Sequence, residues 1–591
     1  MKRIILCIIT LLIATSGSMA QNWNEMIKAV ASDRAASDLF GFTISIDGDR
    51  AAISAPLEGE DGAGGNAVDS AGAVYIFELD AGIWMETAKI VASDRALNDR
   101  FGARICLEGD RIVIGSYIKD DVGAITIEKA GAVYVFDLIG SVWTETAKLV
   151  ASDIGIDNRF GYDVSLSGDR IAVGSFYNDT DAAGANPIIN AGAAYIFELA
   201  GGTWTETTKL VASDREAANF FGLSLSMVGE TVIIGAYRNR YDELGANPLT
   251  NAGSAYVFNL VGGVWTETAK LVASDRDAGD YFGHNIKMDG NKAIIGAYNR
   301  DEPGIGSMTG TAYIFELNGG LWTETAKLLP SDIGAIDHFG YSVDISGNRA
   351  IVGARHEDHD ENGGNILNNS GSAYIFELSG GVWSETNKLV ASDREENDLF
   401  SISVGISGDM VMVGSYREDE DASGGNTLDD AGSVYIFNTC SGIPSVSVSG
   451  VTLTASVTGA AYQWLDCDNG NSIIVSATNQ SFTPTNNGNY AVAVTIGDCI
   501  DTSLCTSITS LGMNTSGDEA KLSIYPNPVN SLLTVETSGN IRAIEIVNIL
   551  GKVIAVHMNN NIIDVSELPK GIYLLKIQTT EYESIVKMIK D

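Results

Sequence analysis

One stretch of sequence occurs seven times in this chain, and no other feature restricts its fold as strongly. Each copy is marked by Phe-Gly, or by Phe-Ser in the last copy, with spacings of 61, 59, 61, 61, 57 and 61 residues. Repeats of this length belong to architectures in which every copy adds one supersecondary unit. The marker phenylalanines are Phe40, Phe101, Phe160, Phe221, Phe282, Phe339 and Phe400.

Each copy contains four short segments in which apolar and polar residues alternate. Such alternation between glycine-rich turns is typical of β-strands. Four strands per copy and seven copies predict an all-β fold, a seven-bladed β-propeller over residues 21–438. In the third copy the segments are residues 162–166, 171–173, 194–197 and 204–210, with a tight hairpin turn at 167–170.

The two ends of the repeat region complement each other. If the strands are named A to D from Phe-Gly onward, the chain opens with a D strand, residues 23–30, before any A strand. The last copy has strands A, B and C after Phe400 and no D. We therefore predict that the N-terminal strand completes the last blade. This closure removes two open sheet edges.

Several polar residues recur in every copy. Trp-x-Glu-x-x-Lys, as at Trp204, Glu206 and Lys209, predicts a packing anchor between blades. Short polar side chains at fixed places in a connection usually bond local backbone amides, so we predict structural roles for them. The Ser-Asp aspartates are Asp33, Asp94, Asp153, Asp214, Asp275, Asp332 and Asp393, and two residues before each marker stand Asp38, Asp99, Asn158, Asn219, Asp280, Asp337 and Asp398.

All variation in length falls between strands B and C. In an up-and-down blade these B–C loops share a face with the D–A connections that carry the Ser-Asp motif. Binding residues commonly lie on loops that a rigid scaffold holds in place. We therefore predict an acidic ligand-binding face there, although the pattern does not identify the individual ligand-binding residues.

The copies share, with substitutions in some of them, the motifs Phe-Gly, Val-Gly-Ala/Ser and Ala-Gly-x-x-Tyr-x-Phe in this order. This order resembles the FG-GAP repeats of integrin α-chain propellers and their bacterial relatives. Family members bind ligands on the loop face, and several hold calcium in Asp-x-Asp-x-Asp-Gly loops. Here no loop has that full spacing, but carboxylates in five B–C loops form a candidate calcium set. The alternative is a solvated turn. The candidates are Asp61, Asp181, Asp242, Asp360 and Asp421, with Asp179, Asp358 and Asp419.

The N-terminus and the charge restrict location and partners. In residues 1–20, Lys2 and Arg3 precede an apolar run that ends in small residues, which predicts a secretory signal peptide. No other stretch is apolar enough for a transmembrane helix. The net charge of −39 disfavours nucleic acid and anionic membranes as partners.

The C-terminal quarter, from residue 439 onward, has a different character. Residues 439–510 predict an immunoglobulin-like β-sandwich, with Trp464 on a central strand. In this exported region Cys440, Cys467, Cys499 and Cys505 predict two disulfides with three possible pairings. Residues 511–519 read as a polar linker.

Residues 520–591 resemble the type A C-terminal sorting domain of type IX secretion, a small β-sandwich. The resemblance implies the type IX secretion machinery as a partner and passage across an outer membrane. The protein is then either released or held at the cell surface. The residues that carry the resemblance are Tyr525, Pro526, Asn527, Pro528, Gly551, Lys570, Gly571 and Tyr573.

Catalytic motifs are absent from the sequence. It has five histidines and no H-E-x-x-H, G-x-S-x-G or P-loop motif. We therefore expect a secreted or surface-held, non-enzymatic binding or adhesion protein with a glycan or protein ligand. The alternatives are a polysaccharide-active enzyme with a site in the divergent B–C loops, and a structural surface-layer component.

Overall fold

The computed structural model describes residues 23–80, 83–120, 126–439, 445–458, 460–469, 471–496, 499–508, 522–537, 540–548, 552–554, 558–559, 561–580 and 583–591. The predicted signal peptide and linker, Cys440 and Gly551 lie outside these residues. The described chain is built from strands, with one 3₁₀ turn at Cys467–Asn469. No helix in this part is long and apolar enough to cross a membrane. The chain divides into two compact units, the first containing the repeats.

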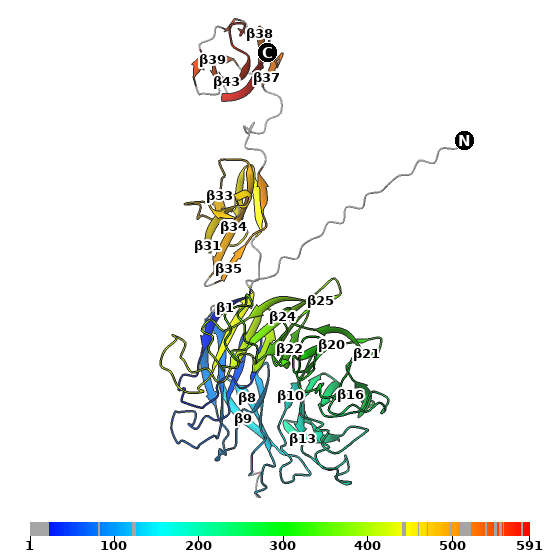
Figure 1. The fold of residues 1–591 in the computed structure, drawn as a ribbon. Coiled ribbons are helices and arrows are strands. Elements are labelled where there is room, and N and C mark those ends of the chain that lie inside the picture. The colour runs from blue at the N-terminus through cyan, green and yellow to red at the C-terminus, as the bar shows by residue number, and fades with distance from the viewer. Residues whose placement is uncertain are drawn as a thin grey trace, which may run out of the picture. The chain divides into compact units, whose positions relative to one another are not determined.

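The first unit contains seven antiparallel four-stranded sheets (Figure 1), as the sequence predicts. Blade 1 comprises β2 (Ile44–Asp47), β3 (Arg50–Ala55), β4 (Ala73–Asp80) and β5 (Ile83–Ile90), and blade 2 comprises β6 (Arg104–Glu108), β7 (Arg111–Ser116), β8 (Ala132–Ile139) and β9 (Val142–Leu149). Blade 3 comprises β10 (Val164–Ser167), β11 (Arg170–Ser175), β12 (Ala193–Ala200) and β13 (Thr203–Leu210), and blade 4 comprises β14 (Leu225–Val228), β15 (Thr231–Ala236), β16 (Ser254–Val261) and β17 (Val264–Leu271). Blade 5 comprises β18 (Ile286–Asp289), β19 (Lys292–Ala297), β20 (Thr311–Asn318) and β21 (Leu321–Leu328), and blade 6 comprises β22 (Phe339–Ser346), β23 (Arg349–Ala354), β24 (Ser372–Ser379) and β25 (Val382–Leu389).

Blade 7 joins the two ends of the repeat region. Its sheet has the order β1-β28-β27-β26, with β1 (Trp23–Ala29), β26 (Ser403–Ser407), β27 (Met410–Ser415) and β28 (Ser433–Thr439). The register places Trp23 opposite Thr439 and Ala29 opposite Val434. The A strands of successive blades contact one another around a complete ring, including β26 with β2. The predicted closure by the N-terminal strand is therefore confirmed.

Small polar side chains fasten neighbouring A strands together around the axis. The hydroxyl of Ser165 accepts a hydrogen bond from the amide of Met227 at 2.9 Å, one blade further on. Two residues further along the strand, the hydroxyl of Ser167 accepts from the amide of Gly229 at 2.9 Å, and the equivalent contact closes the ring, where the amide of Gly48 donates to Ser407 at 3.0 Å. Cys106 occupies the position of Ser165 in blade 2, and its sulfur accepts from the amide of Leu166 at 3.3 Å. The alternation in the A strands thus gives one apolar face and one face that bonds to the next blade.

Close backbone approach also joins the blades. Gly192, at the start of strand C in blade 3, bridges Phe221 at the start of blade 4. Its φ of +87° lies in the left-handed region, and a Cβ there would meet the carbonyl oxygen of Phe221 at 2.0 Å. Only glycine combines both properties without strain. The repeated Ala-Gly and Phe-Gly motifs are therefore the two halves of one contact between blades.

The apolar cores lie between neighbouring sheets. One core contains Trp84 and Tyr75 of blade 1 together with Met412 and Ile436 of blade 7. Trp84 is buried, as expected for a packing anchor. Because each core is shared, no blade buries its apolar face alone.

The second unit begins with two sheets that share a core around the fully buried Trp464. A disulfide joins Cys467 to Cys505. The side chain of Cys499 lies outside the described residues, and the immunoglobulin-like assignment stays a prediction. The first sheet contains β29 (Val446–Ser449), β30 (Thr452–Ala455) and β33 (Ser481–Phe482), and the second contains β31 (Ala461–Asp466), β32 (Ser472–Ile473), β34 (Gly488–Ile496), β35 (Cys499–Thr502) and β36 (Thr506–Ile508).

The C-terminal segment forms two further sheets around a separate core. The buried Tyr573 donates a hydrogen bond to the carbonyl of Pro569 at 2.8 Å. Asn527 accepts from the amide of Ile589 at 2.7 Å, which ties the predicted sorting motif to the last strand. The sheets are β37 (Leu522–Tyr525), β38 (Leu532–Thr537), β42 (Ile562–Asp564) and β41 (Met558–Asn559), and β40 (Val553–Ile554), β39 (Ile541–Asn548), β43 (Gly571–Thr579) and β44 (Glu583–Lys590).

Candidate ligand-binding face

The D–A connections and B–C loops meet at one face of the propeller, and a repeated clamp holds them there. In blade 3, Ser152 donates from its amide and hydroxyl to Glu206 at 2.8 and 2.7 Å. Asp153 accepts from Tyr195 and Lys209, each at 2.6 Å. All seven blades repeat this pattern, including the closing one, where Lys28 and Tyr435 bind Asp393.

The clamp changes one prediction about the polar motifs. The Ser-Asp aspartates bind side chains on strands C and D of the following blade, so the predicted local amide partners are wrong for them. The five aspartates two places before the markers do accept hydrogen bonds from local backbone amides, as predicted. Asp38, for example, accepts from the amide of Ala35 at 2.6 Å.

An arginine that follows the Ser-Asp motif organises five of the B–C loops. Arg215 donates to the carbonyls of Asp179 and Asn186 in the preceding loop, at 2.6 and 3.3 Å. The shorter loops of blades 2 and 5 are instead followed by Ile154 and Ile333. The equivalent arginines are Arg34, Arg95, Arg276 and Arg394.

The candidate calcium ligands are acceptors within these same loops. Asp181 accepts from the amides of Ala183 and Ala185, each at 2.9 Å, and from the side chain of Asn186 at 2.6 Å. These bonds hold the pKa of Asp181 below its usual value. Asp179 accepts from the amide of Asn190 at 2.7 Å. Local hydrogen bonds therefore explain the recurrence of these carboxylates without a metal ion.

Asp61, Asp242, Asp360 and Asp421 make the same kind of loop contact, and Asp358 and Asp419 repeat that of Asp179. Among the described residues, only Asp419 of the eight candidates lies in a group whose acidic oxygens are all within 4.8 Å, together with Asp429 and Asp430. Most of the set is therefore arranged poorly for a shared cation. Calcium at these loops stays a prediction.

Two buried positions beneath the loops vary together from blade to blade. In blade 2, Lys119 donates to Asp99 at 2.6 Å, and in blade 5 Arg300 donates to Asp280 at 2.6 Å. Blades 3 and 4 have asparagine at both positions. Blades 1, 6 and 7 have two acids, the pairs Asp38 with Glu58, Asp337 with Glu357, and Asp398 with Glu418.

The acidic pairs predict a dependence of stability on pH. Burial, reinforced by the neighbouring glutamate, raises the pKa of Asp398 to about 7 from its ordinary value of 3.8. Because the folded state keeps a proton that the unfolded chain loses, stability is lost as pH rises from about 4 to about 7, and then levels off. The slope for one such carboxyl is at most about 1.4 kcal/mol per pH unit.

We expect Asp398→Asn to remove this part of the profile and to make the propeller more stable than the parent at pH 8. The measurement is the free energy of urea unfolding, followed by tryptophan fluorescence at intervals between pH 4.5 and 8. Asp80→Asn, at an exposed acid, is the matched control and should leave the profile unchanged. A parallel shift of both variants at every pH would contradict the prediction.

Nearer the axis, this face carries a cluster made from positions whose residues vary among the blades. These positions precede the marker phenylalanine, follow Phe-Gly, or follow strand B. In blades 4 to 6 they bring together aromatic rings, two arginines and three histidines. This aromatic–arginine cluster consists of Phe220, Tyr237, Arg238, Tyr281, His284, Tyr298, His338, Tyr341, Arg355 and His356.

The cluster is continuous across three blades. The ring centroids of Tyr237 and His284 are 5.9 Å apart, and those of His284 and Tyr341 are 5.1 Å apart. The guanidinium of Arg355 lies 3.6 Å from the ring centroid of Tyr341. That of Arg238 lies 5.3 Å from the centroid of Tyr237. Stacking of this kind is a frequent arrangement for arginine in recognition sites.

Several polar groups in the cluster have no hydrogen-bond partner within the described part of the chain. These are Nε of Arg238, Nε of Arg355, Nδ1 of His284 and both ring nitrogens of His338. His338 is only 9% exposed. Burial and nearby cations lower the pKa of His284 to about 3 and that of His338 to about 4, so both rings are neutral at pH 7.

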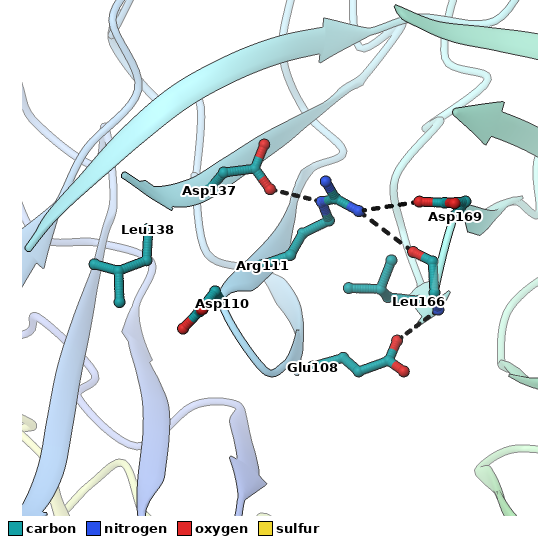
Figure 2. A pocket seen from close by; sticks show the side chains of 8 residues that line it. Glu108, Asp110, Arg111, Asp137, Leu138, Leu166 and Asp169 are labelled. Carbon is teal, nitrogen blue, oxygen red and sulfur yellow. Dashed lines mark hydrogen bonds and ion pairs between the residues drawn. The ribbon is translucent and has the colours of Figure 1, made fainter. Parts of the chain in front are cut away.

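A pocket of about 490 Å³ lies at the opposite ends of the strands, between blades 2 and 3 (Figure 2). Its central Arg111 is paired with Asp137 at 2.6 Å and with Asp169 at 3.7 Å. Arg50 makes the equivalent contacts in blade 1, with Glu78 and Asp110. Because its charges are paired and the pattern recurs, we interpret this pocket as a structural seam between blades.

A closed ring of seven blades, with the same clamp at every junction, defines a β-propeller repeat protein. The FG-GAP repeat family matches more than half of this chain, and the chain belongs to that family. The matches span residues 23–77, 84–136, 143–197, 204–258, 265–315, 322–376 and 383–437. Residues 523–591 match the secretion system C-terminal sorting domain, which indicates export to the cell surface or the extracellular space.

No curated protein matches the sequence. Among solved structures, one titled "Crystal Structure of Mitotic Checkpoint Complex" is similar at 10% identity and a TM-score of 0.37, over 73% of this chain and 98% of that one. A protein from Lactobacillus plantarum is similar at 14% identity and a TM-score of 0.39, over 66% of this chain and 99% of that one. At such scores neither likeness carries an argument about function.

Proposed function

We propose that this exported protein is a non-enzymatic binding protein that meets an extracellular ligand with the loop face of its propeller. One observation carries the proposal. The residues that hold the blades together recur in every blade, whereas the aromatic–arginine cluster is built from positions that differ. Structural need alone does not account for unpartnered arginine and histidine groups beside half-buried aromatic rings.

The composition of the cluster favours binding over catalysis. Glycoside hydrolysis commonly requires two carboxyl groups on either side of the scissile bond. The cluster contains no aspartate or glutamate. The recurring carboxylates of this face are acceptors in the clamps and loops, as for Asp153 and Asp181.

The test uses the mature chain on an array of extracellular glycans and on a panel of cell-surface proteins. We expect saturable binding to at least one ligand class without release of reducing sugars. Release of reducing sugars from a bound polysaccharide would overturn the non-enzymatic assignment. Binding to neither set would overturn the proposed function and favour a structural surface layer.

A further inference from the structure

We propose that the aromatic–arginine cluster binds an acidic sugar residue of a polysaccharide, with Arg238 and Arg355 receiving its anionic group. This inference rests on the proposed binding function and specifies the site and the chemical class of the ligand. It starts from a local excess of positive charge in a chain with 76 acidic and 37 basic residues.

Among the half-buried arginines of the described propeller, these two are exceptional because they form neither an ion pair nor a hydrogen bond to a backbone carbonyl. Elsewhere in the propeller the half-buried arginines either form ion pairs, as Arg50 does, or donate to backbone carbonyls, as Arg215 does. Arg300 contacts Asp275, Asp280 and Glu302. Within the described residues, neither Arg238 nor Arg355 forms an ion pair. Two half-buried guanidinium groups with neither kind of partner indicate that their partner is an anion from outside the chain.

Their placement suits that role. Arg355 lies over the face of Tyr341, and Arg238 lies near the rings of Phe220 and Tyr237. A stacked guanidinium is fixed in orientation and keeps N–H groups along its edge. That planar edge matches a carboxylate or a sulfate through two parallel hydrogen bonds. Side chains held in this way lose little conformational freedom on binding.

The histidines add neutral hydrogen-bonding groups between the arginines. His284 lies between Tyr237 of blade 4 and Tyr341 of blade 6, and its Nδ1 has no partner. Both nitrogens of the buried His338 are also unpartnered. Leaving such buried groups unsatisfied is destabilising, so a ligand that bonds to them gains affinity. The hydroxyl groups of a sugar both donate and accept, so they can satisfy neutral imidazoles in either tautomer.

An acidic sugar fits the whole set better than other anions do. A pyranose ring has one flat apolar face, which packs on aromatic rings, while its hydroxyl groups and anionic substituent bind the polar groups. A nucleic acid requires a broad basic surface, whereas the whole chain has a charge of −39. A peptide strand requires an open sheet edge, and the inner A strands form a closed ring.

The experiment measures binding of the full mature chain by calorimetry to three oligosaccharide sets: uronic acid, sulfated neutral sugar and uncharged glucan. We expect binding to one or both acidic sets, weakening between 0.05 and 0.5 M NaCl. The double variant Arg238→Gln/Arg355→Gln should bind at least tenfold more weakly. Arg100→Gln, which removes an exposed charge from blade 2 on the same face, is the matched control and should bind like the parent.

Equal binding of the uncharged glucan and the acidic sets would overturn the inference, as would unchanged affinity in the double variant. Binding of a protein ligand alone would overturn the inference but leave the proposed function standing. If the double variant fails to fold, Arg238→Lys and Arg355→Lys keep the charge but lose the planar edge. Each should then weaken acidic binding by several-fold at an unchanged melting temperature, and unchanged affinity in both would again contradict the inference.

Discussion

The substitution Gly192→Ala is expected to lower the free energy of unfolding of the propeller by at least about 3 kcal/mol. The added Cβ would lie 2.0 Å from the carbonyl oxygen and 2.5 Å from the amide nitrogen of Phe221. Both atoms belong to the backbone of the next blade, so neither can move without disturbing the ring. The left-handed φ of +87° adds strain for any residue with a side chain.

Gly168→Ala is the matched control for this prediction. Gly168 also has a positive φ, +58°, but nothing lies within 4 Å of the position of its added Cβ. Its cost should therefore be the conformational term alone, about 1 kcal/mol. Urea unfolding followed by tryptophan fluorescence reports mainly on the propeller, because seven of the eight tryptophans lie in its strands. Equal effects of the two substitutions would show that the contact between blades is not tight.

Removal of residues 23–30 is expected to abolish cooperative folding of the propeller. The deletion takes away β1, which pairs with β28 along its length, and it exposes the core around Tyr435 and Phe437. It also removes Lys28 and Glu25, which complete the clamp at Asp393 and Ser392. The measurements are far-UV circular dichroism and calorimetry, in which the single transition of the parent should be lost.

A permuted chain separates loss of the strand from loss of its covalent position. In the permuted chain, residues 23–30 are placed after Thr439 and joined to it by a Gly-Gly turn like that at Gly201 and Gly202. The new N-terminus lies at Ala31. Because Trp23 already lies opposite Thr439, the segment should refold into the same place and restore the transition. A deletion chain as stable as the parent would refute closure, and so would a permuted chain that stays unfolded.

Most of the fold could be predicted because each blade repeats its constraints. The alternation of strands, the constant offsets and the unmatched strand at each end were enough to predict seven blades and their closure. The residues of the clamp recur in the sequence, but their recurrence alone did not show that they contact one another. Ser152 and Glu206 are 54 residues apart, and the same spacing recurs in most copies, which is a signal for contact that propensity arguments overlook.

The aromatic–arginine cluster was missed for a physical reason. Recurring residues are the strongest signal in this sequence, whereas a ligand site in a ring of similar blades arises where the blades differ. Tyr237, Tyr298 and Arg355 occupy one repeat position, and Phe220, Tyr281 and His338 occupy another. Comparing the copies position by position would have found them. Their lack of partners could not have been predicted, because it depends on the packing of three blades.

The paired positions beneath the loops affect how such a protein can be remodelled by recombination. Exchanging a B–C loop between blades carries across the partner at position 58 or 119 but leaves behind the residue at 38 or 99. A hybrid that combined Asp99 with the equivalent of Glu58 would place two acids where the parent has Lys119 bound to Asp99. The segment to exchange therefore begins two residues before the marker phenylalanine, includes strands A and B, and ends after the first residues of the B–C loop. Engineers who graft new recognition loops onto this ring should cut there.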